Sequence, residues 1–137
     1  MKKSFLTGLL VGLFMLLSSM GISMLLQALF PALEQEYART ALFRPWSDPL
    51  MFLIFIHPFV VGFALAWAWS KVKETFHGSV GSRGAKFGLS YWIVATIPGM
   101  LISYSSFQVS FGMVLAWTIS GLISAVIAGL IFAKWNK

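Results

Sequence analysis

Long stretches without a charged side chain alternate with short charged clusters along the sequence. Residues 4–33 carry no Asp, Glu, Lys or Arg, and their apolar part, 5–30, ends just before Pro31, a residue type that interrupts helices. Residues 49–70 form a second charge-free stretch of 22 residues. A helix rising about 1.5 Å per residue crosses a hydrocarbon core of about 30 Å with about 20 apolar residues. The two stretches therefore predict membrane-spanning helices over 5–30 and 49–70.

The third charge-free stretch is too long for one helix. Residues 87–133 give 47 positions without a formal charge, which would make a helix of about 70 Å, more than twice the thickness of the core. The chain must turn back, and the hydroxyl-rich segment 103–110 offers polar side chains for the backbone groups freed at two helix ends. The pattern predicts third and fourth helices over 85–104 and 111–133.

Basic residues fall mainly on one side of the four predicted helices. The N-terminus, the loop 71–86 and the C-terminus hold eight of the ten Lys and Arg residues, and the other side has only Arg39 and Arg44. Because Lys and Arg collect in cytoplasmic loops, both termini are predicted to be cytoplasmic and the membrane to be the inner (plasma) membrane. The predicted fold class is an all-α, four-helix transmembrane bundle in a single domain, residues 1–137.

The segment between the first two helices is the only sizeable one on the external side. Leu33, Tyr37 and Ala41 recur at helical spacing against Glu34 and Glu36, which favours a short helix at the membrane interface. Such a helix can be a connector that covers the bundle or an element that docks a partner. The sequence leaves both interpretations open.

The composition excludes several classes of protein. Hydrophobic residues make up 58% and charged residues 10% of the chain, so the lipid bilayer is the expected partner. The net charge of +6 does not indicate nucleic-acid binding, because the basic residues are spread in pairs rather than gathered on one surface. The absence of cysteine from the sequence excludes disulfides, iron–sulfur clusters and thiolate zinc sites. No cofactor is expected.

Small residues at four-residue spacing predict close packing of the helices. Such residues let helix backbones approach one another in a membrane, within one chain or between copies. The pattern Gly8-x-x-x-Gly12 also aligns with Gly84-x-x-x-Gly88 at the start of the third helix, which hints at a repeat of two hairpins. The four rows are Gly8 and Gly12; Gly62, Ala66 and Ser70; Ala95, Gly99 and Ser103; and Gly121, Ala125 and Gly129.

His57 is the leading candidate for a functional side chain. It is the one Asp, Glu, His, Lys or Arg well inside a predicted helix, and such residues are functional candidates because burying them in a membrane is costly. Pro58 follows it, and Pro98 falls at a similar depth on the third helix; each proline predicts a kink and a freed carbonyl. Together with Gln27 and Tyr104, they define a possible ligand-binding or polar site.

Other interpretations of these residues stay open. His57 can simply hydrogen-bond a freed carbonyl or Gln27, and proline kinks are common in membrane helices. Ser106, Tyr104 and His57 could be drawn as a nucleophile with a base, but no acid within the predicted helices would orient the histidine. The glycine-rich loop 76–86 lacks the spacing of a P-loop. No catalytic, cofactor-binding or metal-binding residue is predicted.

Two short segments carry a resemblance to known proteins. They are Gly-Leu-Ser-Tyr-Trp from Gly88 and Thr-Ile-Ser-Gly-Leu-Ile from Thr118. With the hydropathy of most of the chain, they resemble the uncharacterised small four-span integral membrane proteins of bacteria. The resemblance implies a cell membrane and carries over no site residue.

Two functions from different classes fit these patterns. The first is a non-enzymatic accessory or assembly protein, present as a homo-oligomer or within a larger membrane complex, which the missing catalytic pattern and the packing rows favour. The second is a small transporter or channel with a polar site at the kinked helices near His57. An enzyme acting on lipid is a third and weaker interpretation. The first function is the one we predict.

Overall fold

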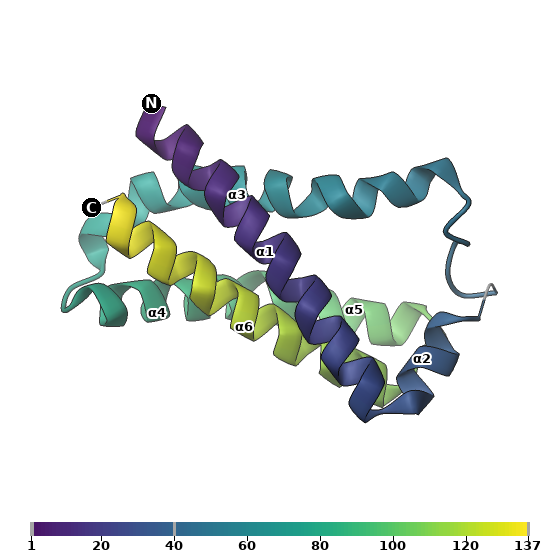
Figure 1. Cartoon of the computed structure of the whole chain (residues 1–137). Helices are drawn as coiled ribbons and strands as arrows, with labels where there is room; N and C mark the ends of the chain where they lie inside the picture. The colour runs from purple at the N-terminus through teal and green to yellow at the C-terminus, as the bar shows by residue number, and fades with distance from the viewer. Residues whose placement is uncertain (1, 40, 137) are drawn as a thin grey trace.

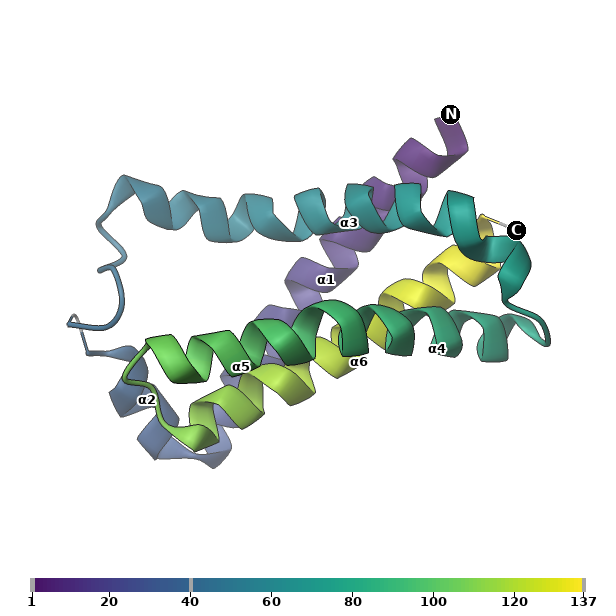
Figure 2. The same cartoon turned by 180° about the vertical axis from the view of Figure 1, so that it is seen from behind.

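Helices make up nearly all of the computed structural model, which describes residues 2–39 and 41–136, with side chains from residue 4. Both ends of the described chain lie at the same end of the molecule, which we call the termini end, and the opposite end is the far end (Figures 1 and 2). In chain order the elements are α1 Lys2–Leu29, α2 Pro31–Tyr37, η1 Pro49–Phe52, α3 Leu53–Val72, η2 Lys73–Thr75, α4 Val80–Tyr91, η3 Trp92–Thr96, α5 Ile97–Ser106 and α6 Phe111–Trp135.

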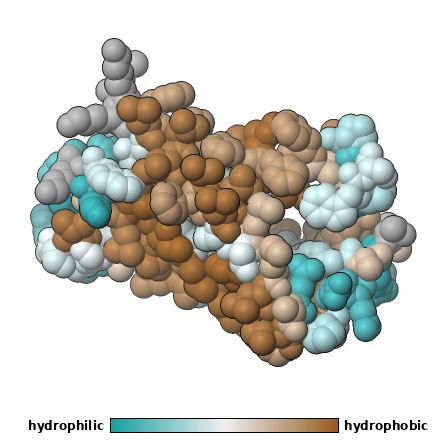
Figure 3. Space-filling model, viewed as in Figure 1, coloured by the Kyte–Doolittle hydropathy of each residue, from teal (hydrophilic) through white to brown (hydrophobic). Residues whose placement is uncertain are grey.

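Four of the helical segments are long and apolar enough to cross a membrane. They are Ser4–Leu29, Pro49–Thr75, Val80–Ser106 and Phe111–Trp135. The predicted all-helical, four-helix architecture is therefore confirmed, and the turn between the last two segments falls inside the predicted 103–110. Hydrophobic residues cover the middle of the molecule and polar residues gather at its two ends (Figure 3), as expected of a multi-pass membrane protein.

Polar caps fix where three of these helices begin. The Ser79 hydroxyl accepts a hydrogen bond from the Ser82 N–H at 3.3 Å, so α4 starts five residues before the predicted position 85. Ser110 caps α6 in the same way. An oxygen of Asp48 accepts from the Leu50 N–H at 2.8 Å. That hydrogen bond, followed by the neighbouring Arg44, lowers the pKa of the Asp48 carboxyl, which stays charged at neutral pH.

Pro98 and Pro58 affect their helices differently. Pro98 has no N–H to donate, and just before it the helix widens into the π-helical turn η3, where the Ile97 N–H donates to the carbonyl of Trp92, five residues back. The predicted irregularity at Pro98 thus takes the form of a π turn. α3, by contrast, continues as α-helix through Pro58.

The first hairpin consists of α1 and α3. Gly62 of α3 holds it together by packing between two glycines of α1. A Cβ atom added at Gly62 would overlap the carbonyl oxygen of Gly8 and lie 2.8 Å from the backbone nitrogen of Gly12. A Cβ atom at Gly12 would lie 2.7 Å from the Cα of Phe59. Every one of these contacts is with backbone, so a side chain at Gly62 can be accommodated only by moving the helices apart.

The second hairpin consists of the α4–η3–α5 segment and α6, and Gly129 of α6 plays the same part in it. An added Cβ atom there would overlap the carbonyl oxygen of Gly84 and lie 2.9 Å from the backbone nitrogen of Gly88. The two contacts match atom for atom: a carbonyl oxygen of the first glycine and a nitrogen of the second face the single glycine of the returning helix. We call each arrangement a glycine clasp. The repeat suggested by the two Gly-x-x-x-Gly patterns is therefore present in the packing.

The correspondence extends beyond the clasps. A shift of 76 positions relates the glycine pair of α1 to that of α4, and a shift of 67 relates Gly62 to Gly129. The same shifts relate Val11 to Phe87, Leu65 to Phe132 and Ala66 to Ala133, and all six side chains belong to one buried cluster. The two hairpins therefore contribute equivalent positions to a common core at the termini end.

Trp69 is the centre of that core. Its side chain is fully buried, its ring stands edge-on to Phe87 at 5.0 Å between centroids, and the guanidinium of Arg83 lies 5.6 Å from its ring centroid. The indole N–H donates to the backbone carbonyl of Asn136 at 2.7 Å. An aromatic residue with its one donor satisfied packs stably in such a position, and here it joins both hairpins.

Away from the termini end, the two hairpins touch along one side only. α1 packs against α6, where the hydroxyls of Ser18 and Ser124 lie 3.2 Å apart. α3 makes few contacts with α6 and hardly any with α5. In the small-residue row predicted on the third helix, Gly99 takes no part in packing within the described chain, because nothing described lies within 4 Å of an added Cβ atom there.

The clasps predict that alanine substitutions at different glycines change the free energy of unfolding in opposite directions. Gly62→Ala and Gly129→Ala should each lower the free energy of unfolding by about 1 to 3 kcal/mol, because the new methyl group overlaps backbone. Gly21→Ala and Gly99→Ala add the same group where nothing lies within 4 Å, and should raise it by roughly 0.5 to 1 kcal/mol, the usual gain in helix propensity. Steric-trapping measurements in bilayers would compare the four variants, and equal effects would rule out the clasps as the main contact.

Candidate functional site

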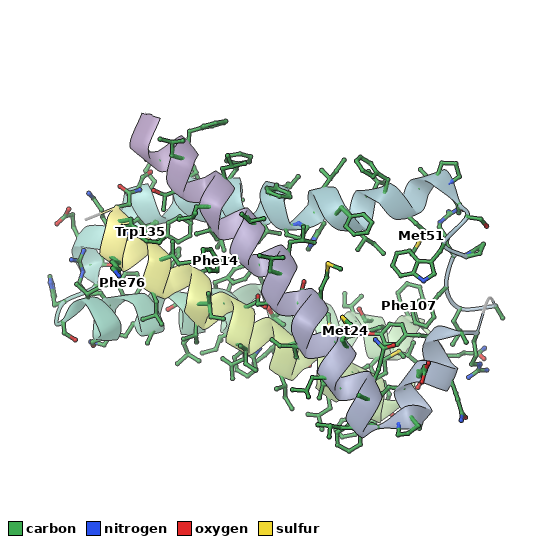
Figure 4. All side chains as sticks on the ribbon, viewed as in Figure 1. Phe14, Met24, Met51, Phe76, Phe107 and Trp135 are labelled. Carbon is green, nitrogen blue, oxygen red and sulfur yellow. The ribbon has the colours of Figure 1, made fainter. Side chains whose placement is uncertain are left out.

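A cavity of about 560 Å³ lies at the far end of the molecule, lined by α1, α2, α6, the segment between α2 and α3, and the start of α3. Met24 of α1 and Met51 of η1 lie on opposite sides of this space (Figure 4). Its volume is within the range of about 300 to 1,000 Å³ that is typical of small-molecule pockets.

Most of the cavity wall is apolar, with one polar strip. Four methionines line it, Met20, Met24, Met51 and Met113, and methionine adapts its shape to irregular contents. The polar strip comes from α1 and α6. It consists of Ser19, Ser23, Gln27 and Ser120.

Within the polar strip, a hydrogen bond holds the Gln27 side chain in place but leaves it free to form further hydrogen bonds. Its amide N–H donates to the Ser23 hydroxyl at 2.8 Å, and the Ser19 hydroxyl donates to the Leu16 carbonyl at 3.0 Å. An amide side chain has two donors and one acceptor. In the described part of the chain the Gln27 side chain makes no other hydrogen bond, so it can bind a polar group inside the cavity.

An aromatic cluster forms the end wall of the cavity, and an acidic clamp outside the lining supports it. Tyr37, Phe43 and Trp117 pack with ring centroids 5.5 to 6.4 Å apart, and the Trp117 N–H donates to the Tyr37 hydroxyl. Glu36 accepts from both the backbone N–H and the hydroxyl of Ser110 at 2.6 Å. The clamp ties α2 to the first turn of α6 and thereby holds the wall in place.

The predicted site residues do not come together. Gln27 lines the cavity, but His57 and Tyr104 are exposed and lie outside its wall. Pro58 is buried and Pro98 is exposed. In the described chain His57 has no hydrogen bond or ion pair, so neither Gln27 nor a freed carbonyl satisfies it, and the arrangement of His57 with Tyr104 and Ser106 as catalytic groups has no geometric support.

The repeat explains why the cavity exists in one hairpin and not in the other. In the second hairpin an added Cβ atom at Gly121 would lie 2.9 Å from Thr96, so the helices stay in contact toward the far end. The shifts of 76 and 67 positions place Met20 and Ile54 at the equivalent points of the first hairpin. There the two residues line the cavity instead. α3 has separated from α1 beyond its clasp, and the cavity fills the gap.

A second open region lies between α3 and the η3–α5 segment. The same shifts make Val94 equivalent to Ser18 and His57 equivalent to Ser124, the two positions that touch where α1 meets α6. Val94 is 76% exposed and His57 is exposed. The interface formed on one side of the molecule is thus missing on the equivalent side. We call this region, around His57, Val60 and Val94, the open side.

No further chemistry is assembled in the described part of the chain. Its His, Asp and Glu side chains form no group of three or more that could hold a metal ion. Comparisons with protein-family models, with curated proteins and with solved structures find no match to this chain. The cavity and the open side therefore have to be interpreted from their own geometry. The cavity was not predicted from the sequence. The sequence indicated it only through methionines in three segments, which line it in the structure.

The acidic clamp can be tested directly. Glu36→Gln should weaken the hold on Ser110, because a neutral amide accepts hydrogen bonds less strongly than a carboxylate, and Ser110→Ala should remove one of the two bonds. Amide hydrogen exchange over residues 31–37 is expected to rise in both variants. Glu34→Gln, with no hydrogen bond from its side chain in the described structure, is the matched control, and an equal rise there would contradict the assignment.

Proposed function

We propose that this chain is a non-enzymatic integral membrane protein that acts as an accessory or assembly factor, binding a transmembrane helix of another polypeptide along its open side. The observation that carries the proposal is the position of His57. It lies about 12 Å from the external start of its helix, on a face that the described part of the chain leaves exposed.

The cost of leaving a histidine in lipid supports a partner. Ionisable side chains within membrane helices almost always face the interior of a bundle or another polar group, because hydrocarbon offers them no hydrogen bond. His57 has no such group within the described chain. A second polypeptide that covers this face would remove the cost.

The repeat supports a helix as the partner. On the side of the molecule opposite the open side, α1 contacts α6 at the Ser18 and Ser124 hydroxyls. On the open side, His57 takes the place of Ser124, and Val94 of η3, which takes the place of Ser18, is 76% exposed. A partner helix with a hydroxyl or carbonyl at the level of His57 would complete the arrangement, with small residues allowing its backbone to approach.

Transport is less well supported. A transporter would need a path to the termini end, and there the fully buried Trp69 and its aromatic neighbours Phe87 and Phe132 fill the space between the hairpins. The cavity and His57 are also separate. The cavity therefore fits a binding site open in one half of the membrane better than a conduit.

The charge distribution supports the inner (plasma) membrane with the termini end in the cytoplasm. Lys71, Lys73, Arg83, Lys86 and Lys134 lie in the described structure at that end, and Lys2, Lys3 and Lys137 are close to it in sequence. This excess follows the rule for cytoplasmic loops. The far end carries Arg39 and Arg44 among the acidic residues Glu34, Glu36 and Asp48.

The orientation can be measured cleanly because the sequence has no cysteine of its own. Single cysteines at Ser79 and at Gln108 would be treated with a membrane-impermeant thiol reagent on spheroplasts. Gln108→Cys should be labelled in intact spheroplasts, and Ser79→Cys only after lysis. The reverse pattern, or labelling of both before lysis, would refute the proposed topology.

The partner helix is tested by substitutions at His57. Extraction of native membrane patches with a polymer, followed by native mass spectrometry, should give the chain in a stoichiometric complex with a second polypeptide, a copy of itself or another chain. His57→Leu should lose at least nine tenths of that complex, and His57→Gln, which keeps a hydrogen-bonding group, should retain most of it.

The control for this experiment is His77→Leu, since His77 is exposed in the loop before α4 and should leave the complex unchanged. Each variant would first be shown to have the thermal transition of the wild type. A wild-type chain that emerges alone with lipid, or a complex that His57→Leu leaves intact, would refute the proposal.

A further inference from the structure

We propose that the far-end cavity binds one acyl chain of a zwitterionic phospholipid, with the ammonium and phosphate groups of that lipid held by the Arg44–Asp48 pair at its rim. This inference is independent of the partner helix, because His57, Val60 and Val94 are not part of the cavity wall.

The size and lining of the cavity select the kind of occupant. A helix with side chains is about 10 to 12 Å across, so about 560 Å³ would hold little more than one turn of it. A flexible apolar chain fits that volume, and the methionines can adjust around it. The polar strip adds a requirement: Gln27 and Ser23 lie where the ester groups of a lipid, which accept hydrogen bonds, could meet a donor.

The rim of the cavity matches a headgroup of both charges. Arg44 lines the cavity and pairs with Asp48 at 2.7 Å. Arginine has five N–H donors in a planar fork, of which the pair uses few, so a phosphate can bind the remaining ones. The Asp48 carboxylate has unused lone pairs and can accept from an ammonium group. An anionic headgroup without an ammonium would meet the carboxylate unfavourably.

The position of the cavity relative to the membrane surface is consistent with a bound lipid. Trp46, which follows Arg44 by two residues and lines the same cavity, is 73% exposed, and tryptophan is enriched at the level of the headgroups. The cavity extends from this rim along α1 to Ser19. Two turns of α1 between Gln27 and Ser19 correspond to about 12 Å, a depth that an acyl chain reaches from the interface.

The experiment is native mass spectrometry of the purified full-length chain in detergent, titrated with phosphatidylethanolamine or phosphatidylglycerol of identical acyl chains. The wild type should retain one phosphatidylethanolamine at least tenfold more strongly than phosphatidylglycerol. Ala116→Trp, which fills the cavity, should lower that retention at least tenfold. Ala64→Trp, at an exposed position outside the cavity, should leave it unchanged.

Two further variants distinguish recognition of the lipid headgroup from binding of the acyl chain. They also provide a second test if one variant does not fold. Asp48→Asn should reduce the preference between the two lipids to less than threefold while one lipid is still retained, because the carboxylate is lost and the cavity is not. Gln27→Leu, a change of similar size, should weaken retention of both lipids. Where Ala116→Trp does not show the wild-type thermal transition, Gln27→Leu decides the role of the cavity in its place.

Three results would overturn the inference. They are equal retention of the two lipids by the wild type, unchanged retention in a folded Ala116→Trp variant, and equal loss in Ala64→Trp, which would indicate a general lipid shell. His57→Leu should still retain the lipid. Loss of the partner complex and loss of the lipid can therefore be told apart, and either proposal can fail alone.

Discussion

The close contact of single glycines with glycine pairs governs the arrangement of the whole molecule. Gly62 between Gly8 and Gly12, and its counterpart in the second hairpin, bring helix backbones into direct contact over a short length. In a hydrocarbon environment, where apolar side chains gain little by leaving lipid for each other, such contact is what holds helices together. The clasps set where each hairpin crosses, and the crossing places Trp69 at the centre of the core.

Beyond the clasps the two halves of the repeat separate, and both candidate sites arise from that difference. The second hairpin stays in contact through Gly121 and Thr96. The first opens at the equivalent points, and the opening leaves the far-end cavity on one side of α3 and the open side on the other. A large residue, Met20, stands where the second hairpin has Thr96, and Ile54 stands where it has a glycine. The asymmetry therefore coincides with a difference in side-chain size at two equivalent positions.

The sequence was most reliable where the physical constraint is local. The number of spans and the turn before Ser110 follow from helix rise and hydrocarbon thickness, and both agree with the structure. The start of α4 differed by five residues, because a cap at Ser79 extends the helix through residues that are not apolar. His57, Gln27 and Tyr104 were grouped by depth alone. Depth along a helix does not fix the face on which a side chain lies, and the three residues lie apart.

The sequence by itself determined the number of helices, the place of the turn between the last two, the residues capable of close packing and the hint of a repeat. Those properties depend on composition and spacing within single segments. Only the tertiary structure decided that Gln27 faces a cavity, that His57 faces outward and that one hairpin opens where its counterpart stays closed. These depend on the rotation of each helix about its axis and on the angle at which helices cross, and both are set by contacts between residues far apart in the chain.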